Sequence, residues 1–467
     1  MSGSTRFLPA LLFLATGCGS RSRLLETAAF DDPSGSSTSS GGSTTTTSSA
    51  TRTLTTSSSG STTTSEGGSG GSGGGTASGG SGGSGGGGAV GDDFLISLSP
   101  GTEYEVSPEL RVTKSGKIAV VWLAQGKSPS KNFVGYSFST DQGVTFSAPQ
   151  LLDEPMGIRA TTALLAITPD DETLVAWGAV DLIDAEGCDC AKFVSVARTA
   201  PGGTTFGASK LAIKTHNAEE LTLTGLGVTA AGTAMLFFNQ FNYQAMVAID
   251  TGAEPWPQKD LPENFLTDPG TRYPVPCQFV GSQPSSFFVA HTSKTGVSGI
   301  LMTNDEGQTW SPVAAYPETL LAPTCVLTGE KLYLAGLWPG SLHLRAGTLQ
   351  SSEAWALDKD TLSFQYQFHY LNMAVDPAGD IHLATFVTAS GYPGVHVFRT
   401  LRQAASPGSP VTNPYGNNTI QADTWPESPT FVGRRAGLAA DSGWLYMAYT
   451  DNSSGKSHIR FHRMPIP

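Results

Sequence analysis

Apolar and polar positions follow a repeating unit along most of the chain. In each unit, an apolar run leads into a polar turn that contains Asp or Gly, and a second run rich in aromatic residues follows. A third alternating run then comes in several units, as in "KFVSVART" (192–199) and "SGILMTND" (298–305). Seven units, roughly 45–65 residues apart, occupy residues 110–125, 163–180, 226–240, 277–291, 325–338, 372–386 and 437–450.

This pattern predicts an all-β protein. Short strands, tight polar turns, no amphipathic helix and a period near 50 residues are typical of a β-propeller. We predict seven four-stranded blades, with six as the alternative if one unit is misread. The last unit supplies only three strands, so we expect the strand "DFLISLSP" (93–100) to close the last blade as its fourth.

The N-terminus carries an export signal. Arg6 precedes an apolar run over residues 7–15, and small residues follow as far as Cys18. Such a run is typical of a signal peptide and too short to span a membrane. The ending "LATGC" resembles the lipobox of bacterial lipoproteins, which implies a lipid on Cys18 and a signal over residues 1–18. The alternative is an ordinary signal peptide cleaved elsewhere, with Cys18 lost.

Residues 19–91 are predicted to be a disordered tether, because residues 31–88 are almost only Ser, Thr and Gly and bury little apolar area. A random coil of this kind spans about 40 Å. The folded domain is then residues 92–467. No later segment approaches the roughly 20 apolar residues of a membrane span, so we expect the membrane to be reached through lipid only. The expected location is the bacterial cell envelope, at the outer membrane or cell surface.

Two octapeptides share one pattern: "STDQGVTF" (139–146) and "TNDEGQTW" (303–310). They resemble the Asp-box (BNR) repeat of sialidase-like propellers, and "TAPGGTTF" (199–206) is a third copy with Pro201 in place of Asp. In that family the motif is a hairpin between the third and fourth strands, away from the active site. We therefore interpret these residues as scaffold: the acids accept turn hydrogen bonds, the glycines adopt special backbone angles and the aromatics pack. They are Asp141, Gly143, Phe146, Asp305, Gly307 and Trp310.

The resemblance implies either a hydrolase or a binding propeller. Sialidases grip the sugar carboxylate with three arginines, because guanidinium groups bind carboxylates through forked hydrogen bonds. "TRYPVPCQFV" (271–280) resembles the family's arginine motif at Arg272 and Pro274, although it lies in the fourth unit. The candidate substrate-binding residues are Arg159, Arg272, Arg435 and Tyr273. The alternative is that these arginines lie on the surface or pair with local acids, and no nucleophile or other catalytic residue is assigned.

The cysteines, the net charge and two tryptophans indicate which bonds, ligands and partners the chain could have. In an exported chain, Cys277 and Cys325 are predicted to form a disulfide between adjacent blades, while the pairing of Cys188 and Cys190 stays open. Nothing indicates a cofactor or a metal. The net charge of −12 argues against nucleic acid, and we expect a monomer. Trp256 and Trp425, in long inserts, could stack on sugar rings or instead fill gaps between blades.

The favoured function is therefore a non-catalytic, lipid-anchored propeller that binds an extracellular glycan or protein at its axial face. The alternative is an exo-sialidase or related glycoside hydrolase. Convergence of the three arginines near a Tyr–Glu pair would favour the hydrolase. Dispersed arginines and an axial channel lined by apolar side chains would favour the binding protein.

Overall fold

The computed structural model describes the domain strand by strand, and every described element is a β-strand. No helix long and apolar enough to cross a bilayer occurs in this part of the chain. The predicted signal peptide with Cys18 and the tether over residues 19–91 lie outside the described residues. Those residues are 93–96, 102–126, 132–152, 158–181, 192–215, 221–240, 244–262, 264–265, 268–269, 271–280, 285–293, 298–316, 320–328, 331–338, 341–348, 358–363, 367–389, 392–401, 419–420, 436–451 and 457–466.

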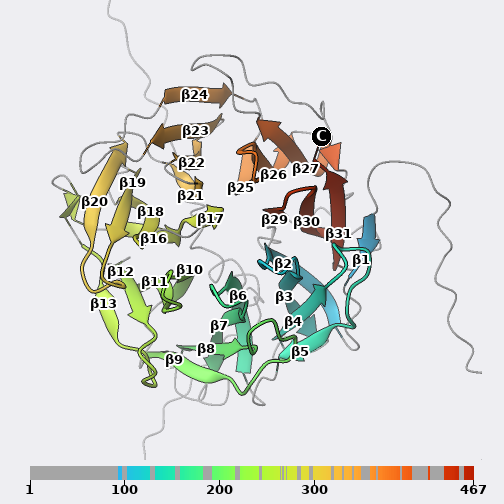
Figure 1. The fold of residues 1–467 in the computed structure, drawn as a ribbon, viewed down its shortest axis with the longest axis horizontal. Coiled ribbons are helices and arrows are strands. Elements are labelled where there is room, and N and C mark those ends of the chain that lie inside the picture. The colour runs from blue at the N-terminus through green and yellow to red at the C-terminus, as the bar shows by residue number, and fades with distance from the viewer. Residues whose placement is uncertain are drawn as a thin grey trace, which may run out of the picture. The chain divides into compact units, whose positions relative to one another are not determined.

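The strands form antiparallel meanders arranged around an axis, which is the predicted propeller (Figure 1). One strand of each meander lies nearest the axis. These inner strands are β2 (Thr102–Val112), β6 (Ile158–Ile167), β10 (Thr222–Val228), β16 (Thr271–Pro276), β21 (Leu321–Thr328), β25 (Gln367–Val375) and β29 (Gly437–Ala440). The second strands are β3 (Ile118–Gly126), β7 (Thr173–Asp181), β11 (Ala234–Gln240), β18 (Phe287–Ser293), β22 (Lys331–Trp338), β26 (Ile381–Ala389) and β30 (Trp444–Asp451).

Two further layers complete the meanders outward from the axis. The third strands are β4 (Asn132–Ser139), β8 (Lys192–Arg198), β12 (Gln244–Ile249), β19 (Ser298–Thr303), β23 (Ser341–Thr348), β27 (Tyr392–Leu401) and β31 (His458–Pro465). The outermost strands are β5 (Gln150–Leu152), β9 (Lys210–Thr215), β13 (Gln258–Asp260), β20 (Ser311–Tyr316), β24 (Asp358–Ser363), β28 (Thr419–Ile420) and β1 (Asp93–Leu95). Three described strands do not belong to these four layers. They are β14 (Asn264–Phe265) and β15 (Asp268–Pro269), which form a small hairpin, and β17 (Gln278–Val280).

The two predicted blade numbers correspond to two ways of counting the described strands. Continuous sheets of four or more strands number six, the alternative given above. One of them, the eight-stranded sheet, contains two four-stranded meanders, β2–β5 and β6–β9. The strand pairing that links them into one sheet is the bridge between Asn132 and Arg159. Counted as meanders, the total is seven.

The N-terminal strand closes the last blade, as predicted. β1 pairs antiparallel with β31, with Phe94 opposite Phe461. The backbone N–H of Ile96 continues this pairing by donating to Ile459 O at 3.0 Å. The fourth strand of the last meander therefore comes from the start of the domain.

The hydrophobic core lies between neighbouring meanders rather than at one centre. One cluster joins the β2–β5 and β6–β9 meanders around Val121 and Leu165, and another joins the β6–β9 and β10–β13 meanders around Leu164 and Phe238. Each meander therefore buries both faces of its strands against its neighbours, which explains why such units form rings.

One predicted strand pairing is wrong. We expected residues 277–280 to form a hairpin with the following strand, β18. Instead β16 pairs with β18, and β17 pairs parallel with β21 of the next meander, with Gln278 opposite Val326. Pairing with β18 continues through Cys277, whose N–H donates to Phe288 O at 2.9 Å, and Cys277 is bonded to Cys325 in β21. The chain is therefore held against the neighbouring inner strand.

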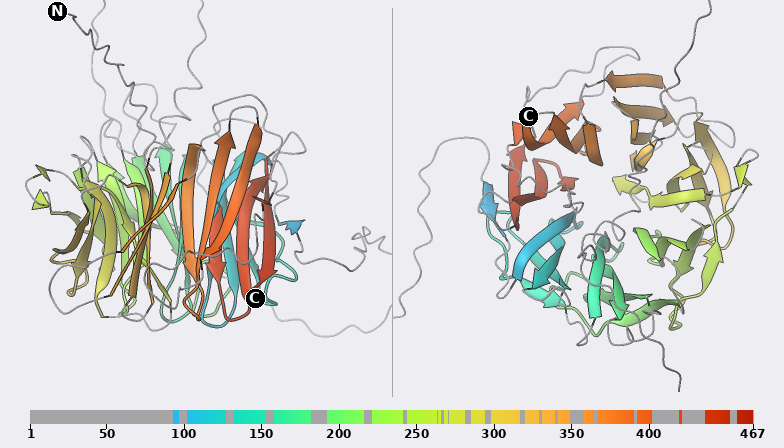
Figure 2. Two further views of the ribbon diagram at one scale, coloured as in Figure 1. Left: turned by 90° about the horizontal axis from the view of Figure 1, so that it is seen from above. Right: turned by 180° about the vertical axis from the view of Figure 1, so that it is seen from behind.

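Because neighbouring strands in a meander are antiparallel, the turns between them alternate between two faces (Figure 2). We call the face where the inner strands begin the start face. The face where they end is the end face, and it carries the turns between inner and second strands and those between third and outermost strands.

Candidate binding site

A cavity of about 760 Å³ lies where the inner strands end. All seven inner strands contribute, so the cavity lies on the propeller axis and belongs to the end face. Its lining residues are Arg111, Val112, Lys114, Ala166, Ile167, Thr168, Pro169, Leu226, Gly227, Val228, Ala230, Pro276, Cys277, Gln278, Phe279, Phe287, Val326, Ala374, Val375, Ala439 and Ala440.

Apolar side chains form most of this lining, and its two cations come from a single wall. Arg111 is at the end of β2, and Lys114 is in the turn that follows. Among the other lining residues, Pro276 and Phe279 are partly exposed. Concave, mostly apolar sites with a few placed polar groups are the usual form of small-ligand pockets.

Arg111 is half-buried, and its Nη1 donates to the carbonyl oxygen of Leu110 at 2.8 Å. Burial lowers the pKa of Arg111, and the charge of Glu109 acts in the opposite direction. Glu109 is itself buried, and its Oε2 accepts from Leu165 N of β6 at 3.1 Å. Burial raises the pKa of Glu109, whereas Arg111 and the Leu165 N–H act to lower it.

The backbone around Lys114 holds that residue beside the next meander. The N–H groups of Lys114 and Ser115 donate to the two carboxylate oxygens of Asp171 at 2.8 and 2.9 Å. Lys114 Nζ donates to Pro169 O at 2.9 Å. Both cations of the cavity thus lie at the junction between the β2–β5 and β6–β9 meanders.

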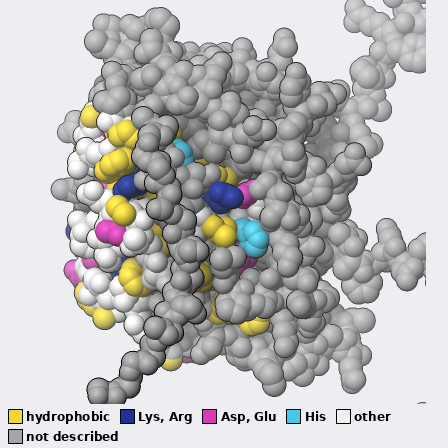
Figure 3. All heavy atoms as spheres, turned by 90° about the vertical axis from the view of Figure 1, so that its right-hand side faces the viewer, with side chains coloured by type: hydrophobic (Ala, Val, Ile, Leu, Met, Phe, Trp, Pro, Cys, Tyr) yellow, Lys and Arg dark blue, Asp and Glu magenta, His cyan; other side chains and the backbone are white. Residues whose placement is uncertain are grey.

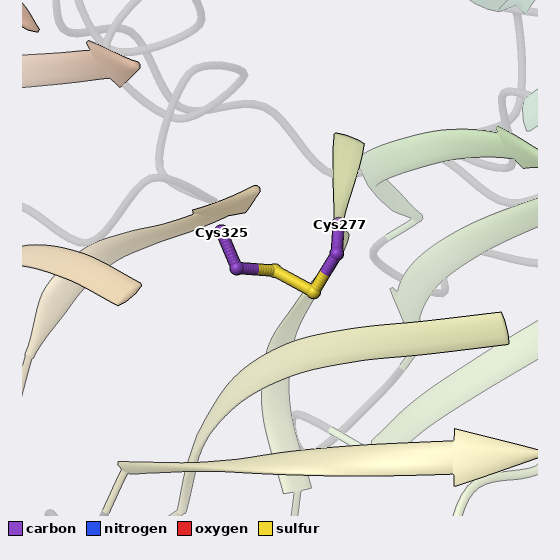
Figure 4. Close-up of a disulfide and its surroundings, with 2 residues drawn as sticks. All are labelled: Cys277 and Cys325. Carbon is purple, nitrogen blue, oxygen red and sulfur yellow. A yellow bond between two sulfur atoms is a disulfide. The ribbon is translucent and has the colours of Figure 1, made fainter. Parts of the chain in front are cut away.

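A disulfide forms part of another wall (Figure 4). Cys277 and Cys325 are bonded, with their Cα atoms 4.6 Å apart, and the bridge joins the β16–β20 and β21–β24 meanders. Both side chains are buried. This is the pairing that the sequence predicts, and it ties β17 to β21 at the cavity.

Two of the three predicted arginines lie at the opposite ends of their strands from this cavity. Arg159 and Arg272 are each the second residue of an inner strand, β6 and β16, so they belong to the start face. At about 3.3 Å per residue, Arg159 precedes Ala166 of the cavity by roughly 23 Å along the same strand. Of Arg159, Arg272 and Tyr273 only the backbone is described, and Arg435 lies outside the described residues.

The remaining candidates from the sequence are either buried in the core or outside the described residues. Trp256 is buried in the core between the β6–β9 and β10–β13 meanders, which is the gap-filling alternative. Trp425, Cys188 and Cys190 lie outside the described residues. Within those residues, no group of three or more His, Cys, Asp and Glu side chains is placed to hold a metal ion.

The octapeptides form turns of the same geometry between third and outermost strands. Asp141 Oδ1 accepts from Thr145 N at 2.9 Å and from Ser139 Oγ at 2.7 Å, and its Oδ2 accepts from Thr145 Oγ1 at 2.6 Å. Asp305 makes the equivalent three bonds with Thr309 and Thr303 at 2.8, 2.8 and 2.6 Å. Both acids are therefore occupied by their own turns.

Each turn also contacts the preceding meander around the ring. The ring centroid of Phe146 lies 4.7 Å from that of Phe461 in β31, and Trp310 lies 5.9 Å from Phe237 in β11. In the third copy, Phe206 lies 4.8 Å from Tyr136 in β4. The aromatic side chain at the end of each octapeptide thus packs between two neighbouring meanders.

A polar cluster joins the last and first meanders at the start face. Glu105 N donates to Ser457 O at 3.0 Å, and Glu105 Oε2 lies 3.5 Å from His458 Nδ1. Arg460 pairs with Asp451 beside them. On the side of the molecule that carries β31 and β1, Figure 3 shows cationic, acidic and histidine side chains close together. These groups connect the two ends of the ring.

Sequence reasoning missed Arg111 and Lys114 as cavity residues. Their signal in the sequence is "LRVTKSGK", two cations at the end of an inner strand and in its turn. The family resemblance instead directs attention to arginines at the starts of inner strands, which belong to the start face.

Comparison with known proteins concerns the fold. No family model matches the chain, and no curated protein matches it. Among solved structures, a protein of unknown function from Dyadobacter fermentans is similar at 13% identity and a TM-score of 0.48, over 80% of this chain and 98% of that one. A Trypanosoma rangeli sialidase solved with the inhibitor DANA is similar at 12% identity and a TM-score of 0.41, over 64% of this chain and 55% of that one.

A third similar structure is an α-L-arabinanase from Penicillium chrysogenum in complex with arabinobiose. It has 12% identity and a TM-score of 0.42, over 63% of this chain and 92% of that one. The chain is thus similar in fold to a sialidase and an arabinanase, and its sequence identity to both is low. At such values the likeness concerns the fold alone, and no argument about activity rests on it.

Proposed function

We propose that this protein is a non-catalytic binding propeller of the bacterial cell envelope, which takes its ligand, part of a glycan or a protein, at the axis. The axial cavity supports this proposal: most of its described lining side chains are apolar, polar groups contribute much of its exposed surface, and its two cations lie on one wall. Such a surface desolvates a ligand and orients it by one charge.

The location is part of the proposal and rests on the sequence. A lipid on Cys18 and a Ser/Thr/Gly tether would hold the propeller outside the cytoplasm at a membrane surface. The octapeptides, as Asp-box repeats, would then serve as scaffold, in keeping with their contacts between meanders.

A hydrolase of the sialidase type is the second candidate. It is favoured by the shared position of Arg159 and Arg272, which both begin inner strands and so belong to the start face. A carboxylate grip there would be separate from the axial cavity at the end face.

The test of catalysis is release of fluorophore from a generic sialoside by the full chain between about pH 4 and 8, with Arg272→Ala assayed beside it. We expect no release above buffer from either protein. Release that disappears in Arg272→Ala would overturn the proposal and establish the second candidate. Release that persists in Arg272→Ala would overturn it too and would exclude Arg272 from the grip.

The anchor is tested separately by metabolic labelling with palmitate. We expect the wild-type chain to incorporate label and Cys18→Ser to incorporate none. Equal labelling of both proteins, or of neither, would contradict lipidation at Cys18.

A further inference from the structure

We infer that the occupant of the axial cavity is a small amphipathic carboxylate, an apolar body with a single carboxylate at the wall formed by Arg111 and Lys114. This inference rests on the proposed function and narrows its ligand. Its site is on the end face, opposite the arginines that the sialidase resemblance singles out.

The charged end of the ligand is specified by Arg111. A guanidinium carries five N–H donors, and Arg111 makes one hydrogen bond to a described residue, the bond to Leu110 O. The remaining donors belong to a half-exposed side chain that lines the cavity, so a ligand can reach them. A carboxylate satisfies them in pairs through forked hydrogen bonds, and Lys114 adds a second cation to the same wall.

Glu109 leaves this position open to an anion. Its Oε2 is turned to Leu165 N of β6, and it is not among the described residues that line the cavity. Glu109 therefore partly balances the charge of Arg111 from behind the wall. A ligand carboxylate would approach from the cavity side.

The uncharged part of the ligand is specified by the remaining walls. Pro276 and Phe279 are partly exposed, and they present apolar surface to the cavity from β16 and β17. An aromatic or aliphatic body loses only apolar hydration. The volume of about 760 Å³ is within the range for drug-sized ligands.

The probe for this site is 2-naphthoate, and 2-naphthamide is its uncharged counterpart of nearly the same shape. Isothermal titration calorimetry on the full chain, in one buffer for all measurements, compares the two. We expect naphthoate to bind at least about tenfold more tightly, since charge-assisted hydrogen bonds contribute about 1.5–3 kcal/mol.

Variants locate the binding. Arg111→Gln should reduce naphthoate affinity at least about tenfold and leave naphthamide binding unchanged, and Arg111→Lys should restore part of the loss. Ala230→Phe, which adds a ring at an exposed position of the lining, should weaken binding of both compounds. Lys210→Gln is the matched control, because this exposed cation lies on the outermost strand β9. It should bind both compounds as the wild type does.

Several results would overturn the inference. They are no binding of naphthoate, equal affinity for naphthoate and naphthamide, and binding that Ala230→Phe leaves intact. Circular dichroism on each variant separates loss of the site from loss of the fold, and Arg111→Lys keeps the test valid if Arg111→Gln unfolds. Sialoside turnover would refute the proposed function independently, whereas failure to bind naphthoate without turnover would refute this inference alone.

Discussion

Asp141 and Asp305 illustrate at the scale of single residues how an exposed acid can be structural. Burial acts to raise the pKa of Asp141, but hydrogen bonds from Thr145, Ser139 and Val144 lower it to about 2. Hydrogen bonds from the side chain and backbone of Thr309, and from Thr303, likewise lower the pKa of Asp305 to about 2. Carboxylates that accept several hydrogen bonds favour their charged form.

Replacing Asp305 by Asn should destabilise the fold in a pH-dependent way. A depressed pKa contributes stability above the unfolded value near 3.9, and this contribution is lost as the pH falls toward 2. We expect Asp305→Asn to lower the melting temperature by a few degrees at pH 7 and the difference from wild type to vanish near pH 2. Asp170→Asn, at an exposed turn position, should change little. A difference that stays constant with pH would contradict the charge-based explanation.

Substitution of Gly143 tests how much the glycine of the turn contributes to stability. Its φ is +78°, and a Cβ there would lie 2.6 Å from two ring atoms of Phe461 in β31. Gly116 has a similar φ of +82° but open space around that position. Both Ala variants therefore carry the same backbone strain, and only Gly143→Ala adds a steric conflict. In urea unfolding we expect Gly143→Ala to be less stable than Gly116→Ala by about 1–3 kcal/mol. Equal losses would show that the contact with the preceding meander has no energetic weight.

Contacts between meanders dominate at the scale of elements. Gln142 O accepts from Arg463 in β31 at 3.1 Å, and Glu306 Oε2 accepts from Thr233 Oγ1 at 2.6 Å. Each octapeptide turn thus contacts the preceding meander through its backbone or side chains as well as through its aromatic residue. The two octapeptides therefore add polar contacts to the apolar packing at two junctions of the ring.

Most elements could be predicted from the sequence, because polar turns separate runs that alternate with period two. The exception, residues 277–280, is instructive. "CQFV" resembles the first run of the other units, and its pattern does not reveal that the disulfide ties Cys277 to β21 and that β17 pairs with β21. Pairing partners depend on such long-range constraints, which local patterns do not carry.

Removal of the disulfide should loosen one junction of the ring. The cysteines are 48 residues apart, and closing a loop of that size is worth about 4 kcal/mol in the chain-entropy account. We expect the Cys277→Ser, Cys325→Ser double variant to unfold at lower urea concentration than the wild type. Reductant should destabilise the wild type and leave the double variant unchanged. A response of the double variant to reductant would assign the effect to other cysteines.

Ring closure and the axial site are properties of the whole molecule. The cavity exists only because seven inner strands, spread from residue 102 to residue 440, end around one axis. No local pattern identifies residues as far apart in the sequence as Arg111 and Phe279 as parts of one cavity. The sequence therefore predicts the propeller and its closing strand, while the position of the cations relative to the cavity requires the structure.

Closure by β1 yields the last prediction. Ile96 is buried beside Ile459 and Phe461, and its N–H donates to Ile459 O. Ile96→Ala keeps the hydrogen bond and removes buried surface, which should cost about 2–5 kcal/mol. Ile96→Pro also removes the donor, so we expect a further loss of stability and faster hydrogen–deuterium exchange in β31. Val144→Ala, at a side chain that is 56% exposed, is the matched surface control and should exchange like the wild type.

The location of the exchange distinguishes ring opening from general destabilisation. If β1 is the closing strand, Ile96→Pro should expose amides of β31 before those of β11 or β7, because only β31 loses its outer partner. Uniform acceleration in all meanders would mean that the proline unfolds the domain as a whole. Unchanged protection of β31 would mean that the ring stays closed without β1. The three-residue strand that follows the predicted tether would then be dispensable, and the contacts of β2 with β31 around Glu105 and His458 would suffice to hold the ends of the ring together.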